Sequence, residues 1–189
     1  MKQLNNIVFT LIALPFPFTT NIDIFPAITA IFRQDKAEEV TVTIKNSAEK
    51  EEILWLARVI FSETKDVDEM EKIAWVVRNR VEAGRWGYSY KEVVLSPSQF
   101  SGLNSWDSQY HININLDYDN NNLIWQKAIV IAKKVYNAEH KERKLSNSIQ
   151  HFYSPEVVRG PSWAENKKPV LITYNSVGKQ TFRFYAGVR

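Results

Sequence analysis

ILWLARVIFSETKDVDEMEKIAWVVRNRV, residues 53–81, contains the strongest structural signal in this chain. Apolar residues recur in it at intervals of three and four, which is typical of amphipathic helices. They form two sets, Ile53, Leu56, Ala57 and Ile60, then Met70, Ile73, Ala74, Val77 and Val81. Capping signals predict the ends. Asn46 can open the first helix, while Asp66 with Glu69 opens a second over 68–83, which Gly84 stops.

Outward from this stretch, a third helix is predicted over 122–138 by apolar residues on one face. The connection 85–121 is long and rich in Ser, Asn, Gly and aromatic residues, so it should be functional or contain small elements of its own. After the third helix the apolar period changes to two, which predicts strands over 149–153, 170–174 and 180–185, the last two joined by a hairpin at 175–178. Helices followed by a small antiparallel sheet indicate an α+β domain.

Composition excludes several classes of function. The 189 residues include no cysteine, so thiol catalysis, disulfides and thiolate metal sites are absent. A net charge of +3 is too small to indicate nucleic-acid binding, which needs a clustered basic surface, but it is compatible with an anionic polymer such as a cell wall. Aromatic residues make up 13% of the chain, which fits either carbohydrate binding or an aromatic core.

The N-terminus resembles an export signal. Lys2 precedes an apolar run over 7–18, which is of signal-peptide length and too short to span a bilayer comfortably. We expect residues 1–30 to be a signal peptide or anchor, 31–46 a linker with a short strand at 40–44, and 47–189 the catalytic domain. Export predicts a secreted or cell-envelope protein. An uncleaved segment would allow membrane association, and a strand-like arm packed on the domain is the other alternative.

Glu63 is the candidate catalytic residue. It is predicted at the C-terminal end of the first helix, on the edge of the apolar face near Leu56. Partial burial and the negative end of the helix dipole both favour the protonated carboxyl group. Such a group can donate a proton to a glycosidic oxygen near neutral pH. The alternative is that Glu63 ends a helix at the surface or pairs with Arg58 or Lys65.

Five short motifs accompany this residue in the sequence. They are LARVIFSET at 56–64, AWVVRNRV at 74–81, VVLSPSQF at 93–100, HFYSP at 151–155 followed by Ser162-Trp163, and SVGKQTF at 176–182. In this order they resemble the cell-wall hydrolase family of the SleB/CwlJ type, typified by a spore-cortex-lytic enzyme, over about residues 54–185. The chain departs from the family at Thr64, usually Ala, at Ser154, usually Asn, and at Gln180, usually His, and it fits poorly over 103–119.

The resemblance implies a lysozyme-like α+β domain that cleaves peptidoglycan glycan strands between N-acetylmuramic acid and N-acetylglucosamine, without a cofactor. Glu63 occupies the position of the single catalytic Glu, and members are thought to act as lytic transglycosylases. A two-carboxylate hydrolase would need a partner about 5–9.5 Å away. Glu165, Asp107 and Asp117 are the candidates, and each is better explained as a solvated loop residue.

Seven further residues are candidates for substrate binding, and each has a structural alternative. Gln99 could bind an N-acetyl group with Phe100 packed below it, or both could hold the long loop on the core. On the strand 149–153, His151 and Tyr153 should face the cleft while Phe152 enters the core. The remaining candidates are Trp163 and Tyr174, which could stack on sugars or pack in the core, and Gln180, which offers a donor and an acceptor.

Other enzyme classes lack their signatures. The three histidines follow no metal-ligand spacing, so a zinc peptidase is not indicated. The chain has no G-x-S-x-G elbow and no phosphate-binding glycine loop, and nucleic acid is not an expected partner. Two alternatives to an enzyme remain, a non-catalytic peptidoglycan-binding module and a phage-associated structural protein.

Overall fold

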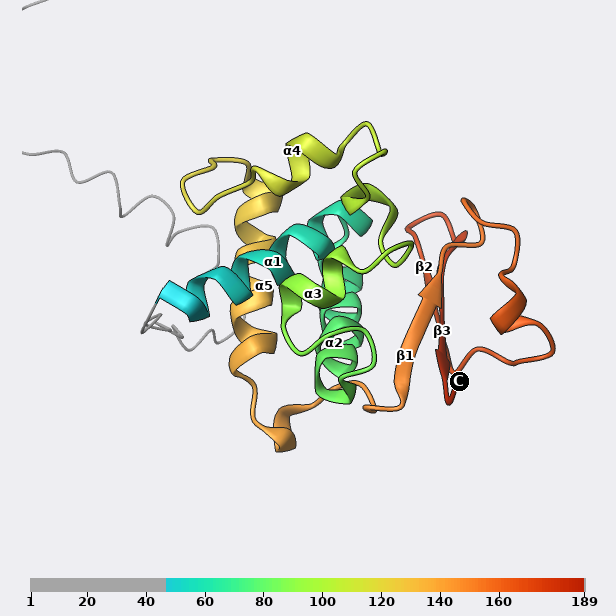
Figure 1. Cartoon of the computed structure of the whole chain (residues 1–189). Coiled ribbons are helices and arrows are strands. Elements are labelled where there is room, and N and C mark those ends of the chain that lie inside the picture. Colours follow the sequence, from blue (N-terminus) through green and yellow to red (C-terminus); the bar gives the residue numbers. More distant parts are fainter. Residues whose placement is uncertain (1–46, 189) are drawn as a thin grey trace, which may run out of the picture. The chain divides into compact units, whose positions relative to one another are not determined.

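The computed structural model describes residues 47–188 (Figure 1). The predicted signal peptide, linker, strand over 40–44 and capping residue Asn46 lie outside this range. In the described part of the chain, three long helices pack together and a small sheet lies beside them, so the predicted α+β class is confirmed. No helix within 47–188 has the length and apolar character needed to cross a membrane.

The three long helices are α1 (Ser47–Glu63), α2 (Val67–Ala83) and α5 (Leu123–Asn137), as predicted to within a residue or two. Asp66 caps α2 by accepting hydrogen bonds from the Asp68 and Glu69 backbone N–H groups, and Gly84 ends it with φ 64°. The apolar stripes meet in one core, and each fully buried large side chain contributes roughly 1.5–3 kcal/mol. Its largest members are Trp125, Phe100, Phe184, Ile53, Leu56, Ile60, Met70 and Ile73.

The long connection between α2 and α5 contains short elements, as its length suggested. They are α3 (Tyr90–Leu95), the 3₁₀ turn η3 (Ser101–Leu103) and α4 (Tyr110–Ile114). Ser89 and Glu92 form a capping box at the start of α3. The connection thereby returns along α1 and places the segment that ends at Phe100 against the core.

The sheet has the antiparallel order β1-β3-β2, formed by β1 (Ile149–Tyr153), β2 (Leu171–Tyr174) and β3 (Gln180–Ala186). The 3₁₀ turns η4 (His140–Glu142) and η5 (Ser162–Ala164) precede and follow β1. Phe152 stacks on Phe184 at 5.6 Å and contacts Phe182 at 5.7 Å, and Phe100 joins them from the helical side at 6.3 Å. Phe152 is therefore partly buried and packs against the core, on the side of the strand that was predicted to face it.

A β-bulge interrupts the pairing of β2 with β3. Ile172 pairs with Arg183 and Tyr174 pairs with Gln180, so Thr173 alone lies opposite two residues, Thr181 and Phe182. A bulge of this kind changes the side from which the following side chains project. Phe182 enters the aromatic core, and the Thr181 hydroxyl reaches Glu69 on α2.

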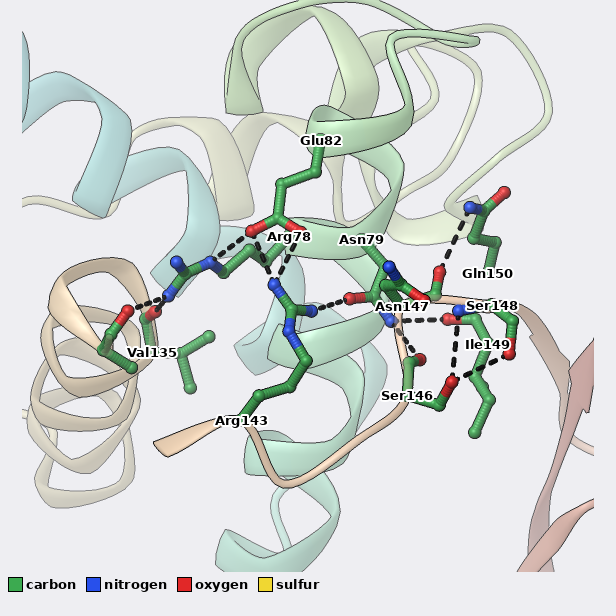
Figure 2. A network of polar contacts seen from close by, with 11 residues as sticks. Arg78, Asn79, Glu82, Val135, Arg143, Ser146, Asn147, Ser148, Ile149 and Gln150 are labelled. Atoms are coloured by element: carbon green, nitrogen blue, oxygen red, sulfur yellow. Dashed lines mark hydrogen bonds and ion pairs between the residues drawn. The ribbon is translucent and has the colours of Figure 1, made fainter. Parts of the chain in front are cut away.

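A polar network fixes the sheet to α2 (Figure 2). The Asn79 amide donates to the carbonyl oxygens of Ser146 at 2.8 Å and Ile149 at 2.9 Å, just before and at the start of β1. Arg143 donates to Asn79 and to both Glu82 carboxylate oxygens. Asn79 therefore ties the α5–β1 connection to α2.

Candidate active site

Glu63 is the last residue of α1, as predicted, and it is half-buried. Its carboxyl group has no hydrogen-bond partner among residues 47–188 and forms no ion pair with Arg58, which instead donates to the Leu116 carbonyl. Burial raises the pKa of Glu63 to about 7, while the positive charges of Arg80 and Lys65 act in the opposite direction. Near neutral pH, a large fraction of this carboxyl group is therefore protonated.

Arg80 brings a buried positive charge toward Glu63. It is 4% exposed, and its Nε donates to the Gln150 carbonyl at 2.7 Å. Its guanidinium lies 5.0 Å from the ring centroids of both Trp86 and Phe100, which holds it by cation–π contacts. Burial lowers the pKa of Arg80 to about 10, and Glu63 opposes this shift, so Arg80 remains charged at neutral pH. This charge stabilises a Glu63 carboxylate once the proton has left.

Gln99 and Phe100 are positioned by Arg80. The Gln99 side-chain oxygen accepts from Arg80 Nη1 at 3.3 Å, and its amide donates to the Pro97 carbonyl at 3.4 Å. Phe100 is 1% exposed and lies below Gln99 in the core. Both residues therefore hold the loop on the core, and half-buried Gln99 is the one of the two with surface left for a ligand.

His151, Tyr153 and Trp163 form an aromatic group on the face of the sheet opposite Phe152. Trp163 lies 5.1 Å from His151, 5.9 Å from Tyr153 and 5.4 Å from Tyr185, measured between ring centroids. Trp86 adds an edge contact to His151 at 5.5 Å. This brings together three of the predicted binding residues, and Trp163 packs on the sheet rather than in the central core.

The charge state of His151 follows from its surroundings. Burial, together with the nearby charges of Arg80 and Arg85, lowers the pKa of His151 to about 4. The ring is therefore neutral at physiological pH. Its Nδ1 is buried and has no hydrogen-bond partner in the described part of the chain. The neutral His151 ring lies between Trp86 and Trp163, at 5.5 Å and 5.1 Å between ring centroids.

Tyr174 and Gln180 face each other across the β2–β3 pairing. Tyr174 is 55% exposed, so its ring surface is available to a ligand. The Gln180 side-chain oxygen accepts two hydrogen bonds from Arg183, from Nε at 2.9 Å and from Nη2 at 2.7 Å. Arg183 Nη1 also donates to the Tyr153 hydroxyl at 3.2 Å. The sequence interpretation did not include Arg183.

Glu69 is a second residue that sequence reasoning assigned differently. It is 6% exposed, and its carboxylate accepts from Thr64 Oγ1 at 2.7 Å and from the Thr181 hydroxyl, which is also within 2.7 Å of Thr173 Oγ1. The sequence predicted that Glu69 helps to open α2. In the structure only its backbone N–H does so, by donating to the Asp66 side chain. Thr64, one of the departures from the family motif, supplies one of the two hydroxyls that hold the Glu69 carboxylate.

The three candidate second carboxylates lie in loops. Asp107 and Asp117 accept from the nearby backbone N–H groups of Gln109 and Tyr118, and Glu165 is exposed. Of the charges in the described structure, only those of Arg80 and Lys65 influence the pKa of Glu63. Among residues 47–188, no three His, Asp or Glu side chains gather as a metal site.

Within residues 47–188, the helical core and the small sheet accompany a Glu63 carboxyl group that has no hydrogen-bond partner and a pKa raised to about 7. The model of the family described as Cell Wall Hydrolase matches residues 64–183, well over half of the chain. The chain therefore belongs to the cell wall hydrolase family. The match begins one residue after Glu63 and includes all seven of the predicted binding residues. No curated protein and no solved structure matches the chain.

Proposed function

We propose that this protein cleaves peptidoglycan glycan strands between N-acetylmuramic acid and N-acetylglucosamine, as a lytic transglycosylase of the SleB/CwlJ type. Family membership indicates hydrolysis of peptidoglycan in general. The observation that carries the finer proposal is Glu63, a half-buried carboxyl group without a hydrogen-bond partner within 47–188 and with its pKa raised to about 7. Residues 47–189 form the catalytic domain in this proposal, and the protein acts outside the cell or in its envelope.

In the first step, Glu63 donates its proton to the oxygen of the glycosidic bond. The bond between that oxygen and C1 of the muramic acid breaks, and the N-acetylglucosamine end leaves as an alcohol. Glu63 becomes a carboxylate. Arg80 stabilises this negative charge, because it lowers the pKa that burial alone would give.

In the second step, the Glu63 carboxylate takes the proton from the C6 hydroxyl of the same muramic acid. The C6 oxygen then bonds to C1, which gives a 1,6-anhydro product and restores the protonated Glu63. No water is consumed, and one carboxyl group serves both steps. A single carboxyl group suffices in this scheme, so a second catalytic carboxylate is not required.

Around this centre we assign the substrate contacts to side chains that lie at or near the surface. Gln99 binds an N-acetyl group while Phe100 supports it from below. Trp163 and Tyr174 offer ring surface to the sugars, and the remaining contacts are proposed for His151, Tyr153 and Gln180. Stacking of an aromatic ring on the apolar face of a sugar would orient the strand over Glu63.

The test is release of sugar fragments from purified sacculi by the full chain and by Glu63→Gln. The variant should keep its fold by circular dichroism and release less than about 1% of the wild-type fragments, since removal of a proton donor costs about 100-fold or more. Glu165→Gln, an exposed loop carboxylate, is the matched control and should remain active. Full activity in Glu63→Gln would refute the proposal. Wild-type protein that binds sacculi without cutting them would indicate a binding module, and failure to do either would favour a structural protein.

A further inference from the structure

Gln180 and Arg183 share one face of β3 although they are three residues apart. In a regular strand, side chains alternate, so residues separated by three project to opposite faces. The bulge at Thr181 and Phe182 adds one residue to β3 and removes this difference. The result is a direct contact between the Gln180 amide and the Arg183 guanidinium.

The contact leaves this group of side chains with an excess of hydrogen-bond donors. The Gln180 oxygen is occupied by two N–H groups of Arg183, so its NH₂ group is what it can offer to a ligand. Arg183 has five N–H donors; three donate to Gln180 and Tyr153, and the guanidinium also interacts with the Tyr185 hydroxyl. Within the described structure, no carboxylate pairs with Arg183. The guanidinium is thus fixed in orientation, charged and not neutralised.

The position of this group connects it with the rest of the site. Tyr153, which accepts from Arg183, belongs to the aromatic group around Trp163. Thr181, next to Gln180, donates to Glu69, and the same carboxylate accepts from Thr64, next to Glu63. The Glu69 carboxylate therefore links the side chain of Thr181, next to Gln180, to the side chain of Thr64, next to Glu63.

We propose that Gln180, Arg183 and Tyr153 form a subsite for a carboxylate on the peptide stem of peptidoglycan. The inference rests on the proposed function. N-acetylated sugars are neutral, whereas peptide stems attached to muramic acid carry free carboxylates. A planar guanidinium held by neighbours binds a carboxylate through two parallel N–H donors, with little loss of side-chain entropy. The subsite makes the protein selective for glycan strands that still bear their peptides.

The test is a binding measurement, which does not depend on cleavage. Calorimetry on the full chain would use three soluble ligands: a disaccharide with its peptide stem, the same compound with the stem carboxylates converted to amides, and the disaccharide without a stem. The acidic ligand should bind about tenfold more tightly than the other two, and added salt should reduce this difference. Equal affinity for the acidic and the amidated ligand would overturn the inference, whatever the result with sacculi.

Two variants test whether the subsite causes the preference for the acidic ligand. Arg183→Met should abolish the tenfold preference, and Gln180→Glu should do the same, because its carboxylate would pair with Arg183 and repel the ligand. Arg159→Met, which removes an exposed charge from the loop after β1, is the control and should keep the preference. Melting temperatures verify that each variant is folded. If both subsite variants retained the wild-type preference, the carboxylate would bind elsewhere and the assignment would be wrong.

Discussion

Glu63→Gln should stabilise the protein, and the gain should depend on pH. The carboxyl group of Glu63 has its pKa raised from 4.5 to about 7 because it is buried without a hydrogen-bond partner in the described residues. Between these two pH values, the unfolded chain has released the proton that the folded chain retains. The free energy of unfolding of the wild type therefore falls as pH rises from about 4.5 to about 7. A Gln side chain has nearly the same shape and does not titrate.

The size of the effect follows from the shift. One pKa unit corresponds to about 1.4 kcal/mol, so a rise from 4.5 to about 7 corresponds to roughly 3 kcal/mol. This stabilisation of roughly 3 kcal/mol is an upper value, because Glu63 is only half-buried and solvent reduces the penalty of burial. At pH 4 the two proteins should have nearly equal stability. At pH 8 the variant should be more stable by up to about 3 kcal/mol, or roughly 10 °C in melting temperature.

Urea unfolding of both proteins at pH 4, 6 and 8 measures this difference directly, provided that the slope with denaturant is unchanged. Other titrating groups affect both proteins equally and cancel in the difference. Glu165→Gln should show no such dependence, because its carboxylate is exposed. A stability difference between Glu63→Gln and wild type that stays constant within about 0.5 kcal/mol from pH 4 to 8 would refute the burial argument.

Three further predictions concern Glu63 and its surroundings. Because Glu63 must be protonated in the free enzyme, kcat/KM on soluble glycan strands should fall about tenfold per pH unit above a pKa near 7, and a profile that is flat from pH 6 to 9 would contradict this. Glu69→Ala should lower the free energy of unfolding by about 2–4 kcal/mol, because it leaves the hydroxyls of Thr64 and Thr181 without their acceptor in a buried place. Thr64→Ala, which restores the usual family residue, should lower the free energy of unfolding by about 1 kcal/mol in the same urea experiment. Equal stability of the wild type and these two variants would show that the hydrogen bonds to Glu69 do not stabilise the fold.

Much of the fold could be predicted from the sequence because its signals are local. The helices α1, α2 and α5 follow from apolar periodicity, and the capping residues Asp66 and Gly84 mark the two ends of α2. The strands follow from alternation, which also places Phe152 in the core and His151 on the other face. The position of Glu63 at the end of α1 needed only the helical repeat.

The rest of the site depends on contacts between distant residues. Glu69 was read as part of a helix start, because its partner Thr181 is 112 residues further along the chain. Strict alternation puts Gln180 and Arg183 on opposite faces, and only the register of the sheet shows the bulge that unites them. The Gln180 side-chain oxygen is occupied by hydrogen bonds from Arg183, and residue types alone do not predict this contact.

The central claim is that Glu63 transfers the proton at the glycosidic bond and then takes one from the C6 hydroxyl. Mass spectrometry of sacculus digests made with wild type and with folded Glu63→Gln tests it most directly. The account predicts muramic acid ends lighter by one water in the wild-type digest and none above background with the variant. Anhydro products in equal amounts from both proteins would contradict it.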